Sequence, residues 1–163
     1  MIETILITNR GEIACRIIKT AARLGIKTCL IYSKEDEDSL AVKMADKAFL
    51  LKSSKGKEQE YLDIDQIIEI ARQNKIEAIH PGYGFLSENF AFAKAIEENN
   101  MKFIGPPAEA IKIMGDKIIS KLQAKNCGVS TIPGVDSETL NRQNDEINEL
   151  YGLIDDLTNK LGV

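Results

Sequence analysis

The chain of 163 residues contains no tryptophan, a single histidine, three cysteines and only 6% aromatic residues. Cys15, Cys29 and Cys127 are odd in number, widely spaced and not accompanied by a cluster of histidines. This pattern argues against a disulfide framework and against a zinc site, and it indicates reduced, mostly buried thiols. A catalytic cysteine is a weak hypothesis, because the only histidine, His80, is better explained by the loop in which it lies.

Long apolar runs are missing as well. No segment approaches the roughly 20 apolar residues that a membrane-spanning helix needs, and we expect no signal peptide at the start. The net charge is −4, whereas nucleic-acid-binding proteins normally present a basic face. We therefore expect a cytoplasmic protein without a membrane or nucleic-acid partner.

The charge is uneven along the chain. From Asp136 onward there are seven acidic and two basic residues, so this segment carries more negative charge than the whole chain. Leu140, Ile147, Ile154 and Leu161 recur every seven residues in the same segment, which is consistent with a coiled coil or with a packed amphipathic helix. Gly152 weakens both interpretations. We place a boundary near residue 135.

The first 126 residues alternate between strand and helix patterns. Short apolar runs predict strands at 4–7, 28–32, 48–51, 78–79 and 102–104, and helical patterns lie at about 11–24, 39–45, 64–71, 89–98 and 117–126. Asp63 is the expected cap of the third helix. The fold class that follows is α/β, a Rossmann-like parallel sheet with helices on both faces, followed by a C-terminal helical segment.

Glycine is scarce where a dinucleotide-binding site would need it. The segment after the first strand, Thr8 to Glu12, has one glycine, and a Rossmann fingerprint requires three for the backbone to approach a pyrophosphate. A nicotinamide-dependent oxidoreductase would need NAD binding that this loop does not favour. Ligands of such sheets bind at the carboxyl ends of the strands, where Asn9, the segment 80–84 and Gly105 are expected.

The most informative segment is 79–89, Ile-His-Pro-Gly-Tyr-Gly-Phe-Leu-Ser-Glu-Asn, which joins an apolar strand to a helix. It resembles the crossover loop of the biotin carboxylase family, the ATP-dependent part of acetyl-CoA, propionyl-CoA and pyruvate carboxylases. The segments 5–16, 103–111, 114–117 and 129–134 resemble the same family in the same order, so the resemblance covers about residues 1–134. One departure is Thr8, where the family usually has alanine.

The resemblance implies three sets of functional residues. It places Lys117 in contact with ATP, although a helix lysine is by itself more often only solvated. It places Tyr83 and Gly84 at the biotin ring; the alternative is that Tyr83 packs under a neighbouring domain. It makes Arg16, Lys19 and Arg23, which share one face of the first helix, part of a homodimer contact; the alternative is a solvated charge stripe.

For two further residues, the sequence allows more than one role. Asp116 is as well suited to capping a helix as to binding a ligand. His80 fits a hydrogen-bonded structural residue better than a catalytic base. The family often has an acidic residue near Arg23, and its absence here removes one complementary charge from the dimer contact.

The resemblance also implies a reaction, in which bicarbonate is activated with MgATP and biotin is carboxylated on a carrier protein or domain. The carboxyl group then passes to a carboxyltransferase component, as in the acetyl-CoA carboxylase of fatty acid biosynthesis. The family's glycine-rich lid, metal-binding glutamates and catalytic arginine belong to an ATP-grasp region that follows the matched segment. We therefore expect a fragment that is inactive alone and binds neither ATP nor Mg²⁺ tightly.

The expected organisation has three parts. Residues 1–112 form the Rossmann-like N-terminal domain of a biotin carboxylase (the pre-ATP-grasp domain), residues 113–135 a helical lead-in to the ATP-grasp region, and residues 136–163 an acidic amphipathic helix. The competing hypothesis is a non-catalytic interaction module, or a truncated gene product, that pairs with an intact carboxylase subunit. The charge stripe of the first helix and the heptad pattern motivate that alternative.

Overall fold

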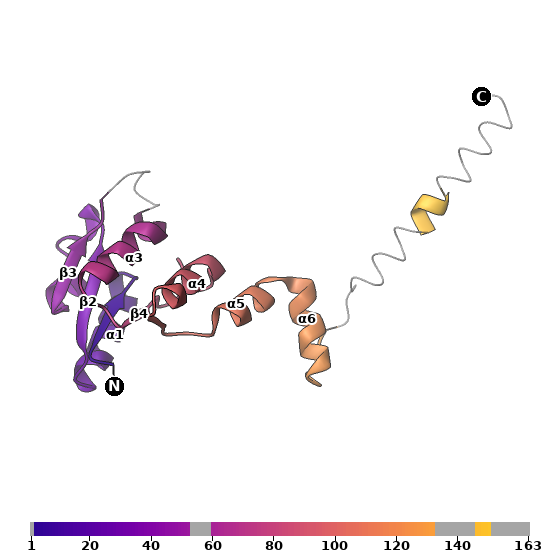
Figure 1. Cartoon of the computed structure of the whole chain (residues 1–163), viewed down its shortest axis with the longest axis horizontal. Helices are drawn as coiled ribbons and strands as arrows, with labels where there is room; N and C mark the ends of the chain where they lie inside the picture. Colours follow the sequence, from indigo (N-terminus) through magenta and orange to yellow (C-terminus); the bar gives the residue numbers. More distant parts are fainter. Residues whose placement is uncertain (1, 53–59, 133–145, 151–163) are drawn as a thin grey trace, which may run out of the picture. The chain divides into compact units, whose positions relative to one another are not determined.

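The structure is a computed structural model that describes residues 2–52, 60–132 and 146–150 (Figure 1). The chain divides into two compact units, Met1–Lys112 and Ile113–Val163, and each is described by itself. The predicted acidic helix of residues 136–163 lies outside the described residues, apart from the helical segment 146–150.

The first unit is built on a parallel sheet of five strands, as the alternating pattern predicts. In chain order the strands are β1 (Thr4–Ile7), β2 (Lys27–Tyr32), β3 (Lys47–Leu50), β4 (Ala78–His80) and β5 (Lys102–Phe103). Their order across the sheet is β3-β2-β1-β4-β5. Every neighbouring pair is parallel, so β1 is central and lies between β2 and β4.

Helices connect the strands: α1 (Gly11–Arg23), α2 (Leu40–Met44), α3 (Ile64–Gln73) and α4 (Phe90–Glu98), with 3₁₀ turns at Lys34–Asp36 and Glu60–Leu62. Side chains of successive strand residues point to opposite faces of the sheet. On one face, Ile5, Ile7 and Leu30 pack with buried residues of α1 and α2. On the other, Leu6 and Ile31 pack with buried residues of α3 and α4. The prediction of helices on both faces is confirmed.

Side-chain caps start several of these helices. Asp63 accepts a hydrogen bond from the backbone N–H of Gln66, which confirms the predicted cap of α3. Ser39 caps α2 and Asn89 caps α4 in the same way. The caps satisfy backbone donors that have no partner inside the helix, and they fix the residue at which each helix begins.

The second unit begins inside α5 (Ala108–Gly115) and continues with α6 (Lys117–Asn126). No residue of α6 is buried, and its apolar residues Ile118, Ile119 and Leu122 are 40 to 50% exposed. A helix with this much exposed apolar surface draws little stability from packing within the described residues.

Two expectations drawn from composition can be compared with the described residues. Cys15 and Cys29 are buried, free thiols, but Cys127 is exposed, so burial holds for two of the three cysteines. Within the described ranges, no helix has both the length and the apolar character needed to cross a bilayer.

Thr8, the residue that departs from the family pattern, lies directly after β1 and is completely buried. Its backbone N–H donates to the carbonyl of His80 at 3.1 Å, but its hydroxyl has no hydrogen-bond partner in the described part of the chain. A buried hydroxyl without a partner costs about 1–3 kcal/mol of stability. Thr28 is a useful contrast, because its equally buried hydroxyl donates to Asp46 at 2.8 Å.

We predict that Thr8→Val raises the free energy of unfolding by about 1 kcal/mol, because valine keeps the shape and removes the unsatisfied hydroxyl. The matched control is Thr28→Val, which removes the two bonds between the Thr28 hydroxyl and Asp46 and should lower the free energy of unfolding by about 2 kcal/mol. Urea titration of the full chain measures both changes. A Thr8→Val variant less stable than the parent would show that this hydroxyl is satisfied.

Candidate functional site

The order of the strands reverses between β1 and β4. The chain proceeds from β1 outward to β2 and β3, then returns to β4 on the other side of β1 and continues to β5. The connections that leave the carboxyl ends of β1 and β4 therefore run to opposite faces of the sheet, and parallel α/β sheets bind ligands where this happens. Here those connections are residues 8–10 and residues 81–89.

Asn9 joins the two connections. Its side-chain Nδ2 donates to the carbonyl of Pro81 at 2.8 Å and to the carbonyl of Tyr83 at 2.9 Å. Its Oδ1 accepts from the backbone N–H of Arg10 at 2.9 Å, and the residue is fully buried. One amide thus satisfies two carbonyls of a loop more than seventy positions away, and we call this arrangement the Asn9 bridge. The sequence places Asn9 at the carboxyl edge but gives no sign of this role.

Gly82 is required by the Asn9 bridge. Its φ is +72°, and a Cβ at this position would lie 2.7 Å from Nδ2 of Asn9 and 2.8 Å from a methyl group of Ile13. Gly84 has φ +68°, but a Cβ there would meet no atom within 4 Å. The first glycine is therefore needed for both space and conformation, and the second for conformation alone.

Tyr83 lies between these glycines, and the residue is 69% exposed. Its carbonyl is held by Asn9, and the carbonyl of Gly84 accepts from the backbone N–H of Ser87 at 2.9 Å. The loop thus presents an aromatic ring with a hydroxyl group to solvent on a backbone fixed by hydrogen bonds. This arrangement suits a flat ligand with polar edges.

His80, the only histidine of the chain, ends β4 and is partly buried. Its Nδ1 accepts from the backbone N–H of Gly82 at 3.0 Å, which confirms the hydrogen-bonded role expected for it. Burial lowers the pKa of His80 below its usual value, and the positive charge of Arg16 lowers that pKa further. The imidazole is therefore neutral near pH 7, as accepting a hydrogen bond at Nδ1 requires.

A second cluster at the same edge of the sheet was not predicted. The ring of Phe85 is stacked on that of Tyr61, with centroids 5.2 Å apart, and the guanidinium carbon of Arg10 lies 6.0 Å from the centroid of Phe85. The Tyr61 hydroxyl donates to Asp36 at 2.8 Å, and Arg10 pairs with Asp36 at 3.9 Å. Burial, and secondly the hydrogen bond to Asp36, raise the pKa of Tyr61 well above its usual range. These residues are too far apart in the sequence for any motif to reveal the cluster.

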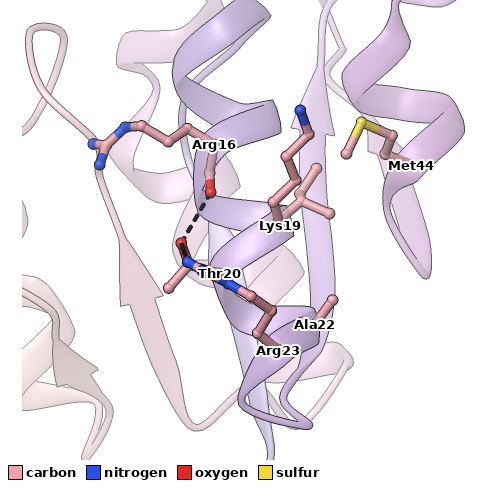
Figure 2. Close-up of a pocket in the computed structure, with 7 residues that line it drawn as sticks. Arg16, Lys19, Thr20, Ala22, Arg23 and Met44 are labelled. Carbon is pink, nitrogen blue, oxygen red and sulfur yellow. Dashed lines mark hydrogen bonds between the residues drawn. The ribbon is translucent and has the colours of Figure 1, made fainter.

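The predicted charge stripe lies on the outer face of α1. Arg16, Lys19 and Arg23 are exposed and line a shallow groove together with Met44 of α2 (Figure 2). Arg23 donates to the hydroxyl of Thr20 at 3.3 Å, and that hydroxyl donates to the carbonyl of Arg16 at 3.3 Å. Within the described residues, none of the three cations forms an ion pair with a carboxylate.

Lys117 is the first residue of α6 and is exposed. Asp116 accepts from the backbone N–H groups of Ile118 and Ile119 at 2.8 and 2.9 Å, so the structure shows Asp116 as the N-cap. Lys117 belongs to the second unit, whereas Tyr83, Gly84 and the stripe on α1 belong to the first.

Among the residues that the structure describes, no group of three or more His, Cys, Asp or Glu side chains is placed to hold a metal. Mg²⁺ in nucleotide sites needs carboxylates beside the phosphates.

Comparison with known proteins gives a consistent result. Residues 1–111 match the family described as biotin carboxylase, N-terminal domain. The pyruvate carboxylase of Bacillus subtilis is 48% identical over 141 residues, which are 85% of this chain and 12% of that protein. The biotin carboxylase of Halalkalibacterium halodurans is 51% identical over 136 residues, 83% of this chain and 30% of that protein.

Solved structures agree with the sequence matches. The biotin carboxylase domain of a thermophilic 2-oxoglutarate carboxylase, bound to bicarbonate, superposes with a TM-score of 0.80 at 44% identity, over 84% of this chain and 30% of that one. A complete pyruvate carboxylase of Rhizobium etli gives a TM-score of 0.77 at 36% identity, over 82% of this chain and 13% of that one. The chain thus spans less than a third of each of these relatives.

We predict that Asn9→Ala lowers the free energy of unfolding by about 3 kcal/mol, because two loop carbonyls lose their buried donor. The matched control is Asn74→Ala, which removes one partly buried bond to the carbonyl of Ile70 and should cost about 1 kcal/mol. Both values come from urea titration. If the two variants lose the same stability, the Asn9 bridge does not hold the loop.

We also predict that His80 titrates below the usual value of about 6.5. Because folding lowers this pKa, the stability that His80 contributes is complete above about pH 6.5 and is lost as the pH falls through the folded-state pKa. The single histidine makes its NMR titration unambiguous. Arg16→Ala should raise the pKa of His80 only in part, since burial is the larger cause, and Lys19→Ala should leave it unchanged. An unshifted pKa in the parent chain would contradict this prediction.

Proposed function

The chain belongs to the biotin carboxylase family through its N-terminal domain, and from this membership we propose that it provides the biotin-facing loop of an ATP-dependent biotin carboxylase. The observation that carries the proposal is the loop 81–89, which is fixed by the Asn9 bridge and presents Tyr83 to solvent. The whole loop lies within the matched residues 1–111.

Tyr83 and Gly84 are the residues proposed to contact biotin. A bicyclic ureido ring has a flat apolar face and polar edges, which match an exposed tyrosine ring and backbone groups beside a glycine. The carbonyl of Tyr83 is already engaged by Asn9, so the loop keeps its shape before any ligand binds. This preorganisation lowers the entropic cost of binding.

Lys117 is the residue proposed to contact ATP. It is an exposed cation at the start of α6, and a related biotin carboxylase domain, from Hydrogenobacter thermophilus, was solved in complex with MgADP and bicarbonate. One exposed cation is worth about 1 kcal/mol, whereas even millimolar affinity requires about 4 kcal/mol. Tight nucleotide binding therefore needs the ATP-grasp region as well.

Two protein contacts follow from the same proposal. Arg16, Lys19 and Arg23 are exposed and form no ion pair within the described residues, so the outer face of α1 suits a second subunit. The biotin would be brought by a carrier protein or domain, and the carboxyl group would pass to a carboxyltransferase component. If the chain has no catalytic role, it would pair with an intact subunit through the same face of α1 or through the acidic segment 136–163.

We predict that the purified chain shows no bicarbonate-dependent ATP hydrolysis above background, with or without free biotin. The reason is that the described residues offer only one proposed phosphate contact and no group of three or more His, Cys, Asp or Glu side chains placed to hold a metal. A coupled ADP-release assay measures this. Turnover by the chain alone would contradict the view that further domains are needed.

A chimeric enzyme tests the proposed function directly. In it, residues 1–134 of this chain replace the matching segment of the Halalkalibacterium halodurans biotin carboxylase. The chimera should carboxylate free biotin. In it, Tyr83→Ala should raise the KM for biotin, and Lys117→Ala should raise the KM for ATP, by about tenfold each. Lys121→Ala, on the same helix, is the control and should change neither. A chimera that folds but cannot carboxylate biotin would overturn the proposed function.

A further inference from the structure

Phe85 has an unusual backbone conformation. Its φ is +45°, in the left-handed region that bulky side chains rarely adopt. It follows Gly82 and Gly84, whose positive φ angles raise no such difficulty. A bulky residue persists in this region only where its surroundings hold it there, and such strain is common beside functional sites.

The surroundings that hold Phe85 are the ring of Tyr61 and the guanidinium of Arg10. The stack with Tyr61 has a centroid distance of 5.2 Å and an interplanar angle of 26°, and Arg10 lies 6.0 Å from the same ring. Aromatic stacking and cation–π contacts both depend on a flat ring. An aliphatic side chain at position 85 could not make either contact.

Both partners of Phe85 are themselves anchored through Asp36. The Tyr61 hydroxyl and the Ser33 hydroxyl donate to Asp36 at 2.8 and 3.2 Å, and Arg10 pairs with the same carboxylate at 3.9 Å. The Tyr61 hydroxyl also accepts from the backbone N–H of Ser33 at 3.2 Å. Phe85 is thereby tied to the connections that follow β1, β2 and β3.

These polar groups satisfy one another, although the same residues line a shallow pocket. The carboxylate of Asp36 already has three partners, and the side chain of Tyr61 is buried. A ligand that bound the Asp36 carboxylate or the Tyr61 hydroxyl would compete with those contacts. The cluster is therefore better suited to fixing the loop than to binding a molecule.

We propose that Phe85 is a positioning residue, which fixes the backbone of Tyr83 and Gly84 through its contacts with Tyr61 and Arg10. Phe85 follows these two residues in the chain, whereas the Asn9 bridge holds the carbonyl of Tyr83 directly. The benefit to biotin binding rests on the proposed function, but the fixing of the loop does not.

The test measures backbone hydrogen exchange by NMR in the full chain without ligand. The reporters are the N–H of Gly82, which donates to His80, and the N–H of Ser87, which donates to Gly84. Phe85→Leu should speed exchange at both by about tenfold, because the loop opens locally. Amides of β1 and α3 should keep their protection. Phe85→Tyr retains the ring and should restore the parent rates.

If Phe85 had a purely structural role, Phe85→Leu would speed exchange throughout the first unit, and that outcome would overturn the proposal. Unchanged rates at Gly82 and Ser87 in Phe85→Leu would also overturn it. If that variant does not fold, Arg10→Gln takes its place, because Arg10 is a half-exposed side chain. Faster loop exchange in Arg10→Gln supports the proposal, and parent rates overturn it. If the loop amides stay protected from exchange but the chimera cannot carboxylate biotin, the proposed function is overturned and the role of Phe85 in fixing the loop is not.

Discussion

The structure depends on one buried amide, that of Asn9, which holds two chain segments together where the order of the strands reverses. Parallel pairing of β1 with β4 places Ile7 opposite His80, so the two connections leave the sheet as neighbours. Without partners, the carbonyls of Pro81 and Tyr83 would favour separation of the two connections, since buried polar groups need partners. The Asn9 side chain satisfies the carbonyls of Pro81 and Tyr83 at once, and Gly82 leaves the space that this approach needs.

The loop combines a rigid backbone with an exposed side chain. Asn9 holds its backbone at Pro81 and Tyr83. The contacts of Phe85 with Tyr61 and Arg10 hold it at residue 85, and Leu86 packs into the core. Tyr83, in contrast, is left largely in solvent. This arrangement is what a ligand-contacting residue requires, because the backbone is ordered before binding and the side chain remains accessible.

His80 connects this loop with the outer surface of α1. It accepts a hydrogen bond from Gly82, and its pKa is lowered by burial and also by Arg16, one of the three cations of the stripe. A partner that neutralised Arg16 would therefore alter the environment of the histidine that orients the start of the loop. Arg16 and His80 also line the same cavity beneath α1, so the charge of Arg16 lies near the imidazole.

The sequence by itself determined the five strands and the helices α1 to α4 of the first unit, because strand and helix periodicities and caps such as Asp63 are local properties of neighbouring residues. It did not predict α5, which begins in the same unit. It also determined the family, through the motif around residues 79–89, and hence the candidates Tyr83 and Gly84. Only the tertiary structure decided how the loop is held. Asn9, Asp36, Tyr61 and Phe85 come from different crossover connections, and their contacts exist only after the parallel sheet brings the carboxyl ends of its strands to one edge. Contacts between residues so far apart leave no periodic signal, since they are set by the packing of the whole sheet and not by local conformational preference.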